Sequence, residues 1–148
     1  MRIESSRRLI DTVAWVLIDN GRILCARPCG KHEFYIPGGK REGQESDLQT
    51  LLREIDEELT VALIPESARH VGTYEAELPG DTTVSVRMAC YTADYIGTLT
   101  PSSEIAEIAW FGYAERDEVP PVDQALFDDL VARGLLPEDS VGDRSVGQ

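Results

Sequence analysis

The chain has 148 residues, the size of one ordinary domain, and 42% of them are hydrophobic, which is typical of a globular protein rather than a disordered one. The formal net charge of -13 argues against nonspecific nucleic-acid binding and against binding to anionic membranes, because both need a basic surface. The negative charge is compatible with a phosphorylated substrate, because bound divalent cations can bridge carboxylates and phosphates. An acidic protein with an anionic substrate needs such a bridge, so the charge points to a divalent metal.

Cysteine content and the first residues bear on the cellular compartment. The sequence has no apolar run long enough to span a membrane, and Met1–Arg8 lacks the apolar stretch of a secretory signal, so we expect a cytoplasmic protein. The cysteines Cys25, Cys29 and Cys90 are too sparse for a disulfide framework, and no paired Cys or His residues complete a zinc site. We expect them to be ordinary buried or partly buried side chains.

The first part of the chain predicts strands. The nearly continuous β-rich run Arg8–Asp19 is typical of a strand buried on both faces. Asn20-Gly21 is a strong hairpin turn, after which residues 23–26 return as the second strand. A short strand over residues 34–36 is expected to stop at Pro37-Gly38-Gly39.

A helix is expected to follow, beginning after Ser46. Ser46 is a favourable N-cap, and Gln49 three residues later completes a capping-box pattern. The apolar side chains recur at helical spacing and define one stripe: Leu48, Leu51 or Leu52, Ile55 and Leu59.

The second part of the chain predicts more strands and a second helix. An antiparallel pair is expected over residues 69–77 and 82–95, a last strand over residues 107–111, and a helix over residues 121–133 that ends at Gly134. The order of strands, helix, strands and helix predicts an α+β fold with helices packed against the sheet. We expect one domain over residues 1–136 and a polar, disordered tail over residues 137–148.

The most informative segment runs from Gly39 to Val61, where glutamates are crowded. Glu57 and Glu58 lie in the last turn of the expected helix, where the negative end of the helix dipole disfavours anions. Glu54 and Glu58 are four residues apart and therefore share one face, on which like charges repel. Such carboxylates become favourable neighbours once a hard cation binds, which suggests Mg²⁺ or Mn²⁺.

The same segment resembles the signature of the Nudix hydrolase family, in its MutT-like subgroup. The signature is Gly, five residues, Glu, seven residues, Arg-Glu, an aliphatic residue, any residue, Glu-Glu, any residue, Gly and an aliphatic residue. The matching positions are Gly39, Glu45, Arg53, Glu54, Ile55, Glu57, Glu58 and Val61. Thr60 stands where the family has glycine. Because threonine at positive φ is costly, we expect a different local turn there.

The resemblance implies a Nudix-type α/β/α sandwich with a mixed β-sheet between helices. It also implies Mg²⁺-dependent (or Mn²⁺-dependent) cleavage of a diphosphate linkage in a nucleoside triphosphate or another nucleoside diphosphate derivative, by water attack at phosphorus. The implied metal ligands are the side chains of Glu54, Glu57 and Glu58 and the carbonyl group of Gly39. Arg53 would orient the glutamates, and Glu45 would secure the loop. The general base would be either Glu57 or Glu104, which lies in the loop ahead of Trp110.

The residues that contact the substrate are less defined by the sequence. Lys40, next to the glycines, is either a phosphate contact or a plain surface lysine. Arg27 is expected to face the pocket from the end of the second strand. Phe34 or Tyr35 either stacks on a base or packs in the core. Asp123 follows a proline pair at the place where MutT-like enzymes carry a base-reading residue, so it either accepts from a purine N–H or caps the second helix.

Other substrates and one other class of protein stay open at this point. The loop Pro37–Lys40 resembles that of nucleoside triphosphate pyrophosphohydrolases, whereas relatives that cleave ADP-ribose more often have alanine in place of Gly38. ADP-ribose and dinucleoside polyphosphates are the alternative substrates. A non-catalytic Nudix-fold nucleotide-binding protein is the rival class, and it is disfavoured because all four signature glutamates are present. The family includes homodimers and monomers, and the sequence does not choose between them.

Overall fold

The computed structural model describes residues 8–143 of the chain. Its main sheet has four strands in the order β4-β1-β7-β6, of which β1 and β7 are parallel and the other neighbours antiparallel. These strands are β1 (Arg8–Trp15), β4 (Gly38–Lys40), β6 (Arg69–Leu78) and β7 (Asp81–Thr92). A three-stranded antiparallel sheet contains β2 (Ile18–Asp19), β3 (Arg22–Pro28) and β9 (Ile105–Phe111), and a short pair joins β5 (Ala62–Leu63) to β8 (Tyr95–Ile96).

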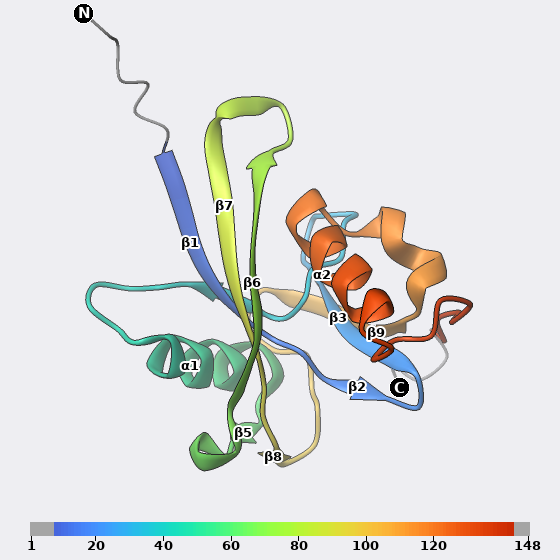
Figure 1. Cartoon of the computed structure of the whole chain (residues 1–148). Coiled ribbons are helices and arrows are strands. Elements are labelled where there is room, and N and C mark those ends of the chain that lie inside the picture. The colour runs from blue at the N-terminus through green and yellow to red at the C-terminus, as the bar shows by residue number, and fades with distance from the viewer. Residues whose placement is uncertain (1–7, 144–148) are drawn as a thin grey trace, which may run out of the picture.

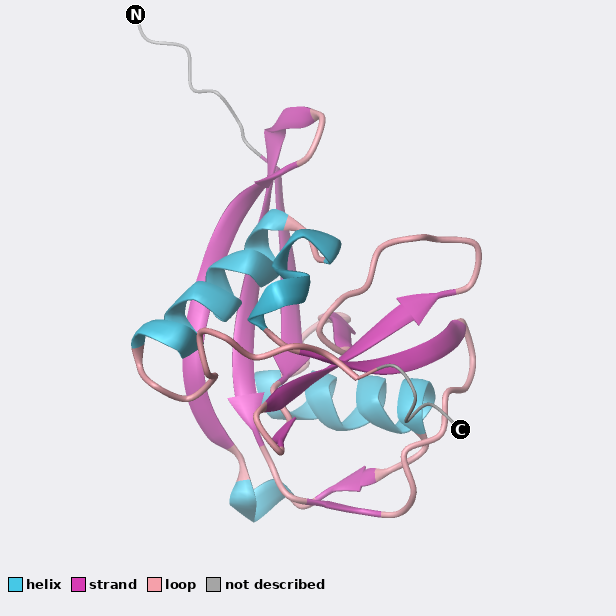
Figure 2. Ribbon diagram, turned by 90° about the vertical axis from the view of Figure 1, so that its right-hand side faces the viewer, coloured by secondary structure: helices cyan, strands magenta, loops and turns pink. Residues whose placement is uncertain are grey.

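Two α-helices cover opposite faces of the main sheet (Figures 1 and 2). They are α1 (Asp47–Leu59) and α2 (Pro121–Ala132), and the short 3₁₀ helices are η1 (Pro65–Ser67) and η2 (Tyr113–Glu118). Successive side chains along β1 and at Val16, the residue after it, point to opposite faces. Val13 and Trp15 join the apolar cluster of α1, while Ala14 and Val16 join that of α2. The predicted α+β sandwich with a mixed sheet between helices is therefore confirmed. Burial on both faces holds for residues 13–16 but not for the ends of the run, where Leu9 is 42% exposed.

Local signals in the sequence explain where the first elements begin and turn. Asn20 and Gly21 both have positive φ values, 57° and 75°, as the tight turn between β2 and β3 requires. Ser46 caps α1 as predicted: its hydroxyl accepts a hydrogen bond from the Gln49 N–H at 3.1 Å, and the Gln49 side chain accepts one from the Ser46 N–H at 2.9 Å. The predicted single strand over residues 8–19 is divided into β1 and β2.

The short strand expected over residues 34–36 does not form a regular strand. Tyr35 makes one isolated antiparallel bridge with Ala26, whereas the N–H of Phe34 donates to the carbonyl of Glu118. The N–H of Ile36 donates to the side chain of Asp123. The backbone on either side of Tyr35 is therefore used to hold the segments around α2, and the strand itself appears after Pro37, as β4.

The expectation of a disordered tail is wrong for residues 137–143. The N–H of Asp143 donates to the carbonyl of Trp110 at 2.8 Å, and the N–H of Gly142 donates to Glu115 at 2.7 Å. Gly112 leaves the space that this segment occupies, because a Cβ atom there would overlap the backbone of Ser140. The segment thus covers β9, the edge strand of the smaller sheet. Residues 144–148 lie outside the described residues.

None of the helices within residues 8–143 is long and apolar enough to cross a membrane.

Candidate active site

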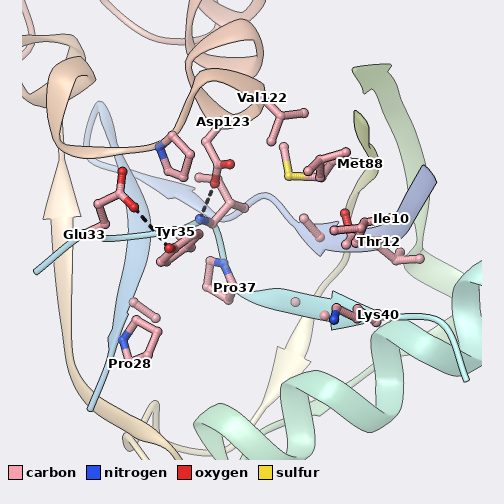
Figure 3. Close-up of a pocket in the computed structure, with 18 of the residues that line it drawn as sticks. Ile10, Thr12, Pro28, Glu33, Tyr35, Pro37, Lys40, Met88, Val122 and Asp123 are labelled. Carbon is pink, nitrogen blue, oxygen red and sulfur yellow. Dashed lines mark hydrogen bonds between the residues drawn. The ribbon is translucent and has the colours of Figure 1, made fainter. Parts of the chain in front are cut away.

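A cavity of about 390 Å³ opens beside β4, between the two helices (Figure 3). Most of its lining is apolar, and α1 and α2 approach it from different sides. Gly38, Gly39 and Glu58 line the part that we call the α1 end, and Tyr35, Ile36 and Asp123 line the part that we call the α2 end. The remaining polar or charged lining residues are Thr12, Lys31, Glu33, Lys40 and Glu77.

The α1 end depends on backbone that only glycine can provide. Gly38 has a φ of 152°, and a Cβ atom there would overlap the carbonyl oxygen of Val13. At Gly39 the carboxyl group of Glu54 lies where a Cβ atom would be, so any larger residue would displace that carboxyl group. The Oε1 atom of Glu58 accepts a hydrogen bond from the Gly38 N–H at 3.3 Å. Two signature carboxyl groups therefore converge on the glycine loop.

Burial and mutual repulsion make both carboxyl groups harder to ionise. Burial raises the pKa of Glu58 to about 8, and the nearby charges of Glu54, Glu104 and Glu57 raise it further. The hydrogen bond from Gly38 acts in the opposite direction and lowers this pKa. Burial also raises the pKa of Glu54, although its ion pair with Arg53 opposes the shift. Glu57 and Glu104 contribute to the raised pKa at Glu54 as well. Glu104, which is distant in sequence, is thus brought within electrostatic reach of both buried carboxyl groups.

Arg53 connects the helix to the loop that precedes it. Its Nε and Nη2 atoms donate to the two carboxylate oxygens of Glu45 at 2.8 and 2.9 Å, and its Nη1 atom donates to Glu54 at 3.0 Å. The bidentate bond from Arg53 lowers the pKa of Glu45 to about 2. Arg53 also reaches the carbonyl of Lys40, at 3.1 Å. These contacts are the ones that the expected roles of Arg53 and Glu45 require, and the catalytic role of Arg53 stays a prediction.

The carboxyl groups of the α1 end fit a hard divalent cation. Glu54 and Glu58 offer oxygen ligands from one face of α1, and a cation would favour the charged forms that burial and repulsion now oppose. The side chain of Glu57 is less enclosed, since it is 54% exposed. It lies 3.8 Å from the guanidinium group of Arg53. In the part of the chain that the structure describes, no three acidic, imidazole or thiol side chains lie close enough to form a preassembled metal cluster. The complete ligand set therefore stays a prediction.

The α2 end is organised by a buried carboxyl group. Asp123 is 3% exposed, and its Oδ2 atom accepts a hydrogen bond from the Ile36 N–H at 2.8 Å. Burial raises the pKa of Asp123 to about 7, and the charge of Glu33 adds to that shift. Of the two roles considered for Asp123, the N-cap of the second helix is not the one observed, because Pro120 occupies that position and makes no side-chain cap bond. Figure 3 shows Asp123 beside Tyr35 and Pro37 at the cavity.

Two of the expected substrate contacts lie away from the cavity. Phe34 is 2% exposed and packs on Phe111 with a centroid distance of 4.8 Å, so it belongs to the core. Arg27 pairs with Glu107 at 2.8 Å, because strand alternation turns it away from the side on which Ala26 and Pro28 line the cavity. Both assignments are therefore corrected.

Lys40 and Tyr35 are the other two expected contacts, and both line the cavity. Lys40 does line the cavity, at its exposed rim, in agreement with a contact to phosphate groups. Tyr35 rather than Phe34 is the aromatic residue at the cavity. The signal for it was present in the sequence, because Tyr35 is the amphipathic residue between two apolar ones, Phe34 and Ile36. No sequence signal identified Glu33 or Met88, which line the cavity from a loop and from β7.

Thr60, the departure from the signature, adopts the left-handed backbone conformation that favours glycine. Its φ and ψ are 58° and 32°, so the expectation of a different local turn is wrong. The hydroxyl of Thr60 lies 2.6 Å from the carbonyl of Leu59 and 3.1 Å from that of Thr100. The contact with Thr100 reaches the segment that carries Glu104. The same segment is also bonded to α1, because the N–H of Ser102 donates to the carbonyl of Glu58 at 2.9 Å. The threonine thus offsets part of its backbone strain by holding this segment.

Comparison with known proteins gives a consistent result across most of the chain. Residues 8–130 match the sequence model of the NUDIX domain. The chain is 32% identical over 142 residues to the CTP pyrophosphohydrolase of Escherichia coli (strain K12), an overlap that covers 89% of this chain and 99% of that protein.

Solved structures with the same fold include bacterial and archaeal proteins. The solution structure of the E. coli ORF135 protein is 27% identical, with a TM-score of 0.71, and the match covers 93% of this chain and 100% of that one. The MutT protein of Methanosarcina mazei Go1 is 19% identical, with a TM-score of 0.71, over 86% of this chain and 96% of that one. The second likeness concerns the fold alone.

Proposed function

The chain belongs to the Nudix domain family and is a pyrophosphohydrolase of nucleotide derivatives, and from that premise we propose that its substrate is a nucleoside triphosphate whose base carries an amino group, cytidine triphosphate first among them. The observation that carries this proposal is the position of Asp123. Its buried carboxyl group lies at the end of the cavity away from the signature glutamates and offers an oxygen to a hydrogen-bond donor. The relative of 32% identity is a CTP pyrophosphohydrolase, which agrees with such a donor.

The amino group provides the selectivity in this proposal. Cytosine presents an N4 amino donor where uracil presents a carbonyl oxygen. Above its raised pKa of about 7, Asp123 is an ionised carboxylate that accepts hydrogen bonds only, so it binds the amino group and repels the carbonyl. The protonated carboxyl group can also donate, so the discrimination should weaken as the pH falls below that value, and the substrates are compared above it. An asparagine at the same place would both donate and accept, and would therefore tolerate either base.

The phosphate groups would lie at the α1 end. Glu54 and Glu58, with Glu57 and the Gly39 carbonyl, would hold Mg²⁺ or Mn²⁺, and Lys40 would contact a phosphate oxygen. When bound, the metal supplies Lewis-acid activation and a lower pKa for the attacking water. Arg53 keeps the carboxyl group of Glu54 turned toward the glycine loop. Either Glu57 or Glu104 takes the proton from the water, since both lie near the buried pair and both are exposed enough to release a proton to solvent.

The proposal is tested by a panel of substrates with Mg²⁺ and with Mn²⁺: CTP, UTP, 8-oxo-dGTP, ADP-ribose and diadenosine tetraphosphate. We expect CTP to give CMP and pyrophosphate, with kcat/KM at least about tenfold above that for UTP, the scale of one well-formed base contact. In ¹⁸O-labelled water, the label appears in the product whose phosphorus is attacked. Label in CMP therefore indicates attack at the α-phosphorus, and label in pyrophosphate indicates attack at the β-phosphorus. Asp123→Asn should narrow the CTP to UTP ratio toward one. Equal turnover of CTP and UTP by the parent protein would reject the amino-group proposal, and turnover of none of the five would reject the activity.

The general base is assigned by comparing two variants, Glu57→Gln and Glu104→Gln. The base is the residue whose loss lowers kcat by about a hundredfold or more and abolishes the acidic limb of the pH–rate profile. We further propose that the protein acts in the cytoplasm on a small-molecule substrate. Whether it works as a monomer or a homodimer is decided by its mass in solution.

A further inference from the structure

We propose that Tyr35 is the residue that selects nucleosides at this site, by packing its ring against the base while Asp123 binds the edge of the base. The proposal rests on the proposed function and deepens it, because it concerns the same cavity. Among the described residues that line the cavity, Tyr35 is the only aromatic one. Every nucleobase offers a π-face, so one aromatic wall favours nucleotides over phosphate esters that carry no base.

Contacts on three sides hold Tyr35 in place. Its backbone is bridged to β3, since its N–H donates to the Ala26 carbonyl and its carbonyl accepts from the Ala26 N–H, both at 2.8 Å. Its hydroxyl donates to Glu33 at 3.2 Å, and the Lys31 ammonium group lies over the ring, 5.9 Å from its centroid. A ring that is already restrained loses little conformational entropy when a base packs against it.

Tyr35 is also tied to the residue that reads the edge of the base. Ile36, its neighbour in the chain, donates its N–H to Asp123 at 2.8 Å, so the aromatic wall and the buried carboxyl group have a fixed relative position. Figure 3 shows Tyr35, Pro37 and Asp123 grouped on one side of the cavity, with Met88, Ile10 and Thr12 on the other. A planar base that lies against Tyr35 can therefore present its edge to Asp123 while its sugar and phosphates extend toward Lys40.

The ring and the hydroxyl of Tyr35 have different roles, and two variants separate them. Tyr35→Leu removes the aromatic wall and keeps an apolar side chain, whereas Tyr35→Phe keeps the wall and removes only the bond to Glu33. The matched control is Tyr113→Leu, because Tyr113 is a partly buried tyrosine whose hydroxyl also donates to a carboxylate, Asp128 at 2.7 Å, but which does not line the cavity.

The experiment compares CTP with methyl triphosphate, which carries the same phosphate chain without a base. For Tyr35→Leu we expect KM for CTP to rise about tenfold, the scale of losing one aromatic–base contact, with kcat within about twofold of the parent value. Turnover of methyl triphosphate should not change. Tyr35→Phe should raise KM for CTP less than threefold, and Tyr113→Leu should have no effect on either substrate.

Two results would overturn the proposal. A parallel loss with CTP and methyl triphosphate would place the effect at the phosphate end, and an unchanged KM for CTP would show that the ring does not meet the base. Binding of the analogue α,β-methylene-CTP, measured by calorimetry with Mg²⁺, gives a second reading that does not need turnover and keeps the cation that bridges carboxylates and phosphates. If the parent protein hydrolyses no triphosphate yet Tyr35→Leu binds the analogue about tenfold more weakly, the proposed activity fails and the role of Tyr35 stands. If the parent does not bind the analogue, the role of Tyr35 fails as well.

Discussion

The α1 end of the cavity takes its carboxyl groups from a single helix and the loop before it, whereas the α2 end collects its groups from segments almost ninety residues apart. Glu54 and Glu58 follow one another on a face of α1, and Arg53 ties Glu54 to the preceding loop. At the other end, Tyr35 comes from a loop after β3 and Asp123 from α2, and one hydrogen bond joins the two segments. A contiguous site can be recognised from spacing alone, whereas an assembled one becomes visible only when the fold is known.

The largest effect should come from breaking the α1 end alone. We expect Glu58→Gln to lower kcat by more than about a hundredfold, because it removes a charged oxygen ligand from the buried pair. Selectivity between CTP and UTP should be unchanged, since the base is read at the other end. Steady-state kinetics with Mg²⁺ measure both quantities. Asp56→Asn, an exposed acidic residue on the same helix, is the matched control, and wild-type turnover by Glu58→Gln would refute the metal assignment.

The second effect concerns the α2 end and is a change in stability with pH. The pKa of Asp123 is raised by burial to about 7, well above the value of a free aspartate, so the folded protein holds a proton that the unfolded chain has lost. The contribution of Asp123 to the free energy of unfolding should therefore fall as pH rises, by about 1.36 kcal/mol per unit, or about 2 kcal/mol between roughly pH 5 and 6.5. Glu58, whose pKa is also raised, adds a fall of the same sign. Asp123→Asn should remove only the contribution of Asp123, as urea unfolding at several pH values can measure. Parallel curves for parent and variant would show that Asp123 is ionised in the folded state.

A smaller effect is expected from weakening the connection between helix and loop. Arg53→Lys keeps the charge but cannot make the bidentate bond to Glu45, so we expect kcat to fall by about tenfold with little change in KM. The concentration of Mg²⁺ needed for half-maximal rate should rise as well. Arg69→Lys is the control, because Arg69 is exposed and its side chain bonds to the carbonyl groups of Glu66 and Ala68. An unchanged metal requirement would mean that Arg53 does not orient the ligands.

The smallest effect should follow from restoring the glycine of the signature. Thr60→Gly relieves roughly 1–2 kcal/mol of left-handed backbone strain but loses the hydroxyl contacts to Leu59 and Thr100, worth about 1 kcal/mol. The free energy of unfolding should therefore change by less than about 1 kcal/mol, as urea denaturation would report. A loss of several kcal/mol would mean that the threonine is essential to this turn.

Much of the fold follows from local sequence signals. The Asn20-Gly21 turn, the cap at Ser46 and the glycine after α2 each act within a few residues, and each prediction based on them agrees with the structure. Two expectations failed because the deciding partner is far along the chain. The strand over residues 34–36 gave way to bonds with Glu118 and Asp123, and the tail was ordered by contacts with β9.

The site shows the same division between local and distant causes. The pairing of Arg53 with Glu45 follows from the spacing of the signature, because both ends lie in one contiguous segment. The direction of Arg27 depends on how β3 pairs with β9, and those of Phe34 and Tyr35 depend on the bridge to Ala26 and the bond to Glu118. A periodic pattern specifies none of these distant pairings. The expectation for Thr60 was wrong for another reason. A left-handed backbone is costly for threonine, but the contact with Thr100 that compensates for this cost comes from forty residues away.

The covering of β9 by residues 137–143 has a consequence for how the protein behaves in solution. An uncovered edge strand offers unpaired N–H and carbonyl groups to any other strand that approaches it. Asp143 takes up one such carbonyl, at Trp110, and the residues before it lie across Gly112. A chain shortened after Leu136 would keep its cavity but leave the edge of β9 uncovered, so we expect aggregation to be its first defect.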